Sequence, residues 1–261
     1  MKRIILAGAL ALLSSLPGLM AQQKGPQPKS QKEVEALQAM FGAQDPDTRI
    51  KAANDVLTKF ADTEFKAIAM YLTAASYEQK NDFEKMAVWA EKTLEVDPKN
   101  YGAMLMLAGG LAKHSGENDL DLEEKLTRSE KYAKQAIEIL NTAEKPNPQL
   151  TDDQWAGAKK DMVSQAHETF GIIAMLRKKH DVAITEFKQA VEGSSTPDPT
   201  TLIRLARVYT VAGKPDDAIA LLDKVMSSAD TPAQIKQYAQ AERVRAVQAK
   251  GGAAATPAPK N

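Results

Sequence analysis

Apolar residues recur every three or four positions along most of this chain, the pattern of helices that each bury one face. The first such stripe covers residues 33–42 and ends at Gly42. Asp45-Pro46 then begins a second helix, with the aspartate as N-cap and the proline at the first helical position. Further stripes follow as far as Lys250, so we predict an all-α fold.

The stripes repeat at a fixed interval. Ala67–Asn100 holds two of them, separated by the polar turn Lys80-Asn81-Asp82 and followed by Asp97-Pro98. Key positions of its first helix recur after roughly 34 residues, and a later pair of helices recurs after 35. The matching positions are Met70, Ala74 and Tyr77 with Met104, Ala108 and Leu111, and then Phe170, Gly171, Ala183 and Ala190 with Leu205, Ala206, Ala218 and Val225.

A unit of this length, with a small residue where two helices meet and a large one a turn later, resembles the tetratricopeptide repeat (TPR). The resemblance implies a right-handed TPR-type α-solenoid of helix-turn-helix units that each pack on their neighbours. We therefore expect four TPR-like repeats in residues 67–230, at 67–100, 101–141, 151–198 and 199–230. The second carries an insertion at Ser115–Thr127, and the third has an elongated first helix that starts with a capping box, Thr151 and Gln154.

The flanking segments are expected to differ from the repeats. Residues 33–66 should form an irregular helical pair, and residues 231–250 a capping helix. Residues 22–32 and 251–261 are rich in Gln, Pro, Lys, Ala and Gly without an apolar stripe, so we expect a disordered linker and a disordered tail. The capping helix should present a polar outer face, as the end of a solenoid requires. That face holds Lys236, Gln237, Gln240, Glu242 and Arg243.

Two details of the helices are open to test. Gly109-Gly110 lies inside a predicted helix and costs roughly 2 kcal/mol relative to two alanines. Close packing of two helices would explain the pair, as would a hinge or a ligand that approaches the backbone. We expect Asp119 or Asp121 to cap the second helix of the second repeat, and Asp181 to cap that of the third.

The N-terminus has the three parts of a secretory signal peptide. Lys2 and Arg3 precede the apolar run Ile4–Leu13, and Leu16–Ala21 ends in a small residue. We expect residues 1–21 to be removed and the mature chain to be periplasmic or secreted, without stable membrane insertion. The alternative is an uncleaved membrane anchor, which the short apolar run and Pro17 disfavour.

A narrower resemblance covers about a quarter of the chain. Val56-Leu57, Phe60–Phe65 and then Ala69, Leu72 and Tyr77 are similar to a segment of certain cell-envelope TPR proteins. Those are the TPR lipoprotein of the outer-membrane barrel-assembly machinery and the coordinator of the Tol–Pal system. Ala61 departs from the proline common there, and this chain has no cysteine to carry a lipid. The resemblance implies an envelope location.

The composition argues against several classes of function. The chain has 34 basic and 34 acidic residues, so nothing favours nucleic acid as a partner. It has no cysteine, which excludes disulfides, thiolate ligands and cysteine nucleophiles. Its three histidines are scattered, and no nucleophile elbow, P-loop or dinucleotide fingerprint occurs. We therefore predict no catalytic residues, no cofactor and no metal site.

The TPR resemblance also implies where a partner would bind. In the first helix of each repeat, a stripe next to the core stripe would line the concave face, and here it keeps several apolar residues. An apolar strip with a polar edge is typical of a partner groove. The alternative is that the N-terminal helices or the insertion fold over the strip. The predicted partner-binding residues are Tyr71, Ala75, Glu78, Leu105, Gly109, Glu168, Ile172, Met175, Ile203 and Arg207.

These inferences lead to a non-enzymatic, exported scaffold that binds a protein or peptide in the bacterial envelope. A structural role in an outer-membrane assembly or cell-division complex is an alternative. A third possibility is an accessory domain of an envelope hydrolase. It is disfavoured because the repeats fill the chain and leave no room for a catalytic domain. The identity of the partner does not follow from the residues.

Overall fold

The computed structural model describes residues 25–147 and 149–254, and within these ranges it contains helices and no strands. The expected signal peptide, residues 22–24 of the linker and residues 255–261 of the tail lie outside the described residues. The helices are α1 (Gln31–Gly42), α2 (Pro46–Lys59), α3 (Lys66–Gln79), α4 (Phe83–Val96), α5 (Tyr101–Lys113), α6 (Leu122–Thr142), α7 (Asp152–Leu176), α8 (His180–Gly193), α9 (Pro199–Val211), α10 (Pro215–Ser227) and α11 (Ala233–Ala254).

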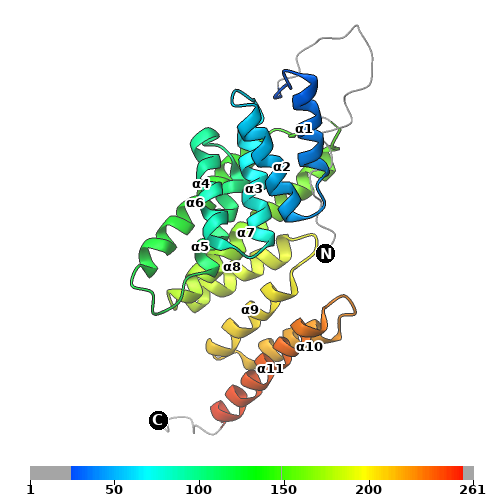
Figure 1. Ribbon diagram of the computed structural model, residues 1–261. Coiled ribbons are helices and arrows are strands. Elements are labelled where there is room, and N and C mark those ends of the chain that lie inside the picture. The colour runs from blue at the N-terminus through cyan, green and yellow to red at the C-terminus, as the bar shows by residue number, and fades with distance from the viewer. Residues whose placement is uncertain (1–24, 148, 255–261) are drawn as a thin grey trace.

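The helices stack in chain order as an α-solenoid, as predicted. Each packs on its sequence neighbours, and first helices of successive pairs also meet, α3 with α5, α5 with α7 and α9 with α11. Figure 1 shows α1 and α2 at one end of the stack and the α9–α11 unit at the other. The core is accordingly divided into successive clusters along the chain, each built from neighbouring helices.

The turns inside the helix pairs share one backbone feature. Asn81, Lys178 and Gly213 have φ values of 56°, 58° and 73°, each at the end of a first helix and just before the second begins. This left-handed conformation reverses the chain in few residues and favours glycine. In the second pair the turn is replaced by a loop between Lys113 and Leu122, so the second half of the segment Ser115–Thr127, expected as an insertion, belongs to α6.

The helix starts test the capping predictions. The Asp45 carboxylate accepts the amide of Thr48 ahead of Pro46, and Thr151 and Gln154 form the expected capping box. Asp121 is the N-cap residue of α6 but makes no side-chain cap bond; its carboxylate pairs with Lys125. The prediction for Asp181 is wrong, because α8 begins at His180 with Lys179 as its N-cap residue, so that Asp181 lies in the first turn.

The flanks are more ordered than the composition suggests. Helix α1 begins at Gln31 with Ser30 as its cap, and Lys29 makes an ion pair with Asp62, so residues 25–32 do not form the expected disordered linker. Helix α11 continues to Ala254, four residues into the expected tail. Glu242 does not lie on the outer face of α11: it is 3% exposed, because it shares the inward stripe with Ala239 and Ala246.

Candidate functional site

The predicted concave stripe is closed over much of its length. Leu105, Ile172 and Ile203 are only 3%, 4% and 1% exposed, and Gly109 is buried as well. Tyr71, Ala75, Glu168 and Met175 are partly buried, whereas Glu78 and Arg207 are exposed. The expectation of a continuous apolar strip on the surface is therefore wrong at its centre, and binding at the remaining positions stays a prediction.

Neighbouring first helices close the stripe. Leu105 of α5 belongs to a cluster that includes Ala166 and the partly buried Met162 of α7. Ile203 of α9 lies in a cluster with Ala239 and Ala246 of α11. The N-terminal helices form a separate cluster with α3, so they are not what covers these residues. The apolar residues of this stripe thus hold successive repeats together.

Glu168, another residue of the stripe, joins three helices through charge. Its carboxylate accepts a hydrogen bond from the Arg204 guanidinium of α9 and lies 3.5 Å from Nζ of Lys113 at the end of α5. Only 12% of the Glu168 side chain is exposed, so this network is shielded from solvent on the carboxylate side. Its geometry assigns Glu168 to the internal structure of the solenoid.

Tyr71 is held against α5. A Cβ placed on Gly102 would come within 2.8–2.9 Å of the Tyr71 ring and hydroxyl, so the ring lies directly on the backbone of α5. Burial, and to a smaller extent the charge of Glu78, raises the pKa of the Tyr71 phenol to about 12. The phenol therefore remains neutral at physiological pH.

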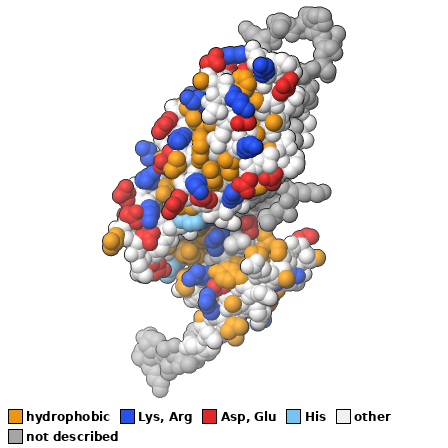
Figure 2. Space-filling model, viewed as in Figure 1, with side chains coloured by type: hydrophobic (Ala, Val, Ile, Leu, Met, Phe, Trp, Pro, Cys, Tyr) orange, Lys and Arg blue, Asp and Glu red, His pale blue; other side chains and the backbone are white. Residues whose placement is uncertain are grey.

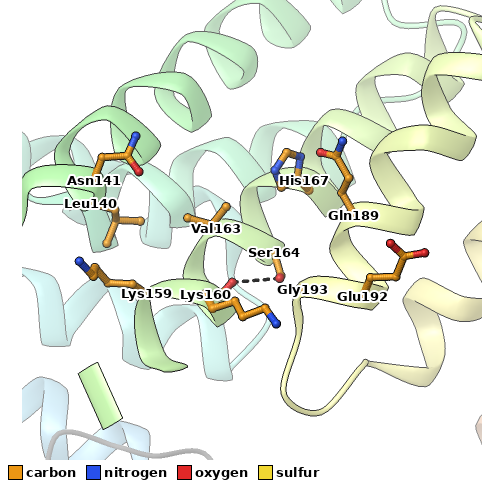
Figure 3. A pocket seen from close by; sticks show the side chains of 10 residues that line it. All are labelled: Leu140, Asn141, Lys159, Lys160, Val163, Ser164, His167, Gln189, Glu192 and Gly193. Atoms are coloured by element: carbon orange, nitrogen blue, oxygen red, sulfur yellow. Dashed lines mark hydrogen bonds between the residues drawn. The ribbon is translucent and has the colours of Figure 1, made fainter. Parts of the chain in front are cut away.

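The larger of two described cavities lies elsewhere, between α6, α7 and α8. This opening, here called the outer cleft, has a volume of about 570 Å³. Helices α6 and α8, the second helices of adjacent pairs, form its walls, and the middle of α7 forms its floor (Figure 3). Its lining residues are Leu140 and Asn141 of α6, Lys159, Lys160, Val163, Ser164 and His167 of α7, and Gln189, Glu192 and Gly193 of α8.

The outer cleft follows from the length of α7. That helix has 25 residues and α8 has 14, so the N-terminal part of α7 continues beyond the helix that it pairs with. Trp155 fixes this extension, because it is buried and its indole Nε1 donates to the Ala143 carbonyl at 3.2 Å, just after α6. Leu140 and Val163 give the cleft an apolar patch, and the charged and amide side chains surround it.

Two polar groups on the floor have fixed partners. Nδ1 of His167 lies 2.7 Å from a carboxylate oxygen of Glu186, and the ring meets Phe170 edge-on at a centroid distance of 6.0 Å. The Ser164 hydroxyl donates to the Lys160 carbonyl at 2.9 Å, one turn back in the same helix. Ser164 is thus engaged with the backbone instead of with the nearby imidazole, and the pair does not form a nucleophile relay.

Three other features would also mark a functional site: a metal site, a membrane-spanning helix and a surface patch of one charge. No three His, Asp or Glu side chains gather as a metal site within residues 25–147 and 149–254. Across those same residues, every helix is too short or too polar to span a membrane. In Figure 2, basic and acidic side chains alternate over the visible face instead of separating into patches of one sign.

Comparison with known proteins agrees with the fold. No protein-family model matches this chain, and no curated protein sequence matches it. Among solved structures, a thermophilic TPR protein of Thermus thermophilus superimposes with a TM-score of 0.55 and 16% identity, covering 81% of this chain and 99% of that one. A TPR protein of Parabacteroides merdae gives 0.45 at 14% identity, with 88% and 95% covered. The assembly chaperone of RpL4 gives 0.46 at 12%, with 85% and 98% covered. The first of these similarities establishes a TPR-type fold.

Proposed function

We propose that this protein is an exported, non-catalytic scaffold that binds a protein partner in the bacterial cell envelope. The observation that carries the proposal is the outer cleft, an open site of about 570 Å³ on a solenoid of helix pairs. Its volume lies within the range of roughly 300–1,000 Å³ that is common for small-molecule pockets. It combines an apolar patch at Leu140 and Val163 with polar side chains at the edge, as binding sites in proteins commonly do.

The envelope location rests on the sequence. The charged, apolar and small-residue segments of residues 1–21 support export, and the segment around residues 56–77 resembles envelope TPR proteins. A solenoid suits such a role because it presents a long surface that is held rigid by packing between neighbours.

Site-specific photo-cross-linking tests the binding role. A photoreactive phenylalanine analogue replaces Gln189 in the cleft or, as a matched control, Lys188 on the same helix but outside the lining. A third position, Arg207, samples the exposed part of the inner face. We expect one discrete adduct from Gln189 in the native host, identified by mass spectrometry, and none from Lys188.

Two results would overturn the proposal. If Gln189, Lys188 and Arg207 all failed to give a discrete adduct in folded protein, the scaffold role would lose its support. If the chain were recovered from the cytoplasm, the proposed location would be wrong. If the chain in the envelope fraction still began at Met1, the expected removal of residues 1–21 would be wrong.

A further inference from the structure

The outer cleft contains side chains that the rest of the described chain leaves without partners. No hydrogen bond or ion pair to another described residue engages the side-chain head groups of Asn141, Lys160, Gln189 or Glu192. Among the described residues, the Lys159 ammonium interacts only with the Trp155 ring, with Nζ 5.6 Å from the centroid. The polar groups of the cleft therefore remain available to a ligand.

The two amides favour a peptide as that ligand. Asn141 comes from α6 and Gln189 from α8, and they face the cleft from opposite walls (Figure 3). Each amide carries both donors and an acceptor, the set needed to bond a backbone N–H and a backbone C=O. An extended peptide that runs between them can satisfy both walls, which a simple anion cannot do.

The charges select the side chain that such a peptide carries. Lys159 and Lys160 supply two positive charges from the floor, and the one other cationic candidate among the described lining residues, His167, is already paired with Glu186. Glu192 lies on the α8 wall and repels an anion on that side. Figure 3 shows the Lys159 ammonium on the α6 side and the Lys160 ammonium pointing toward α8, so an acidic side chain is favoured near Lys159, away from Glu192.

The apolar patch adds a second requirement. Leu140 and Val163 lie on the α6 side and on the floor, and Lys159 lies on the same side. In an extended chain, residues two positions apart point to the same side. An apolar residue and an acidic residue two positions apart can thus reach the patch and Lys159 together.

We propose that the outer cleft binds an extended segment of the partner, with its backbone between Asn141 and Gln189 and an acidic side chain at Lys159. This inference rests on the proposed scaffold function and specifies the chemistry of the partner at that site.

Fluorescence anisotropy with defined peptides tests it. The probe is a fluorescein-labelled Ser/Gly peptide with Leu and Glu two positions apart, and its counterpart carries Lys in place of Glu. The mature protein should bind the acidic probe more tightly than the basic one, and added salt should weaken this binding. Removing an exposed charge pair changes affinity by about two- to fivefold, so Lys159→Glu with Lys160→Glu should weaken it by about tenfold or more.

Two further variants distinguish an effect of the cleft residues from a general effect of surface charge. Lys188→Glu changes charge on α8 outside the lining and should leave the affinity unchanged, whereas Gln189→Trp should fill the cleft and abolish binding. Circular dichroism confirms that each variant is folded.

The outcomes are distinguishable from those of the scaffold proposal. Equal binding of both probes, no binding of the acidic probe by the wild type, or an equal effect of Lys188→Glu would overturn the inference. If Gln189 still cross-linked its partner in the Lys159→Glu, Lys160→Glu background, the scaffold role would stand and the acidic selection would fall.

Discussion

The glycine pair of α5 gives a sharp test of the packing, because its two members should respond in opposite directions to the same substitution. A Cβ on Gly109 would meet only Thr169 Oγ1, at an ordinary 3.8 Å. A Cβ on Gly110 would lie 2.5 Å from Met86 Cε and 2.8 Å from the Phe83 ring. The Phe83 ring in turn stacks on His114 with centroids 4.4 Å apart, so its freedom to move away is limited.

The magnitudes follow from these distances. Alanine in place of a glycine inside a helix increases the free energy of unfolding by about 0.5–1 kcal/mol. We expect this full increase for Gly109→Ala. Gly110→Ala gains the same helical stability, but it overpacks the contact between α4 and α5, which costs about 1–3 kcal/mol of stability. We expect a net loss of about 1 kcal/mol there. Since about 1 kcal/mol shifts the melting temperature by about 2–4 °C in a chain of this size, the two variants should lie on opposite sides of the wild type.

Thermal unfolding followed by circular dichroism measures the difference. Gly157→Ala in α7 serves as a control, because nothing lies within 4 Å of its Cβ position and only the helical gain should appear. Equal stabilisation by Gly109→Ala and Gly110→Ala would show that α4 and α5 do not approach closely, and the explanation of the glycine pair by close packing would fail.

Three further predictions concern other parts of the fold. The Tyr71 phenol ionises near its ordinary pKa of 10.0 in the unfolded chain and near about 12 in the folded one, so the stability that it contributes is present below pH 10 and is lost as the pH rises. The wild type should therefore lose about 1 kcal/mol between pH 10 and 11 that Tyr71→Phe retains, as measured by urea unfolding, and parallel pH profiles would contradict the burial. Gly213→Ala should cost about 1 kcal/mol in thermal unfolding solely through its φ of 73°, because its Cβ would meet nothing within 4 Å, and an unchanged stability would refute this. Deletion from residue 231 onward should expose Ile203 and Leu222 and lower the melting temperature, whereas deletion of residues 255–261 should not; equal effects would contradict capping by α11.

The fold was accessible from the sequence because its signals are local. A small residue facing a large one recurs at each helix pair, and the structure shows why at Gly171, where an added Cβ would lie 2.7 Å from the buried Phe187 ring. The cap residues Asp45 and Thr151 act on amides three positions ahead. Such features need no knowledge of the rest of the chain.

The candidate site was less accessible, for a physical reason. Spacing places Leu105, Ile172 and Ile203 on one side of their helices, but the depth to which the next helix covers that side depends on how closely the helices approach. Here the inner positions of α5 include Gly102, Gly109 and Ala112, and small side chains permit a close approach. The same residues that mark the stripe in the sequence therefore close it in the fold.

The outer cleft, in contrast, leaves no trace in the periodic pattern of the sequence. Its residues come from three helices at positions that do not repeat, so no periodicity marks them. The available signal was the unbroken run from Thr151 to about Lys178, which predicts a first helix much longer than a repeat requires. Because α8 covers only part of that helix, the remainder must find other neighbours, and Trp155 anchors it beside the end of α6. The elongated α7 thus forms the floor of an opening between the outer helices α6 and α8, and this opening holds charged and amide groups such as Lys160 and Gln189.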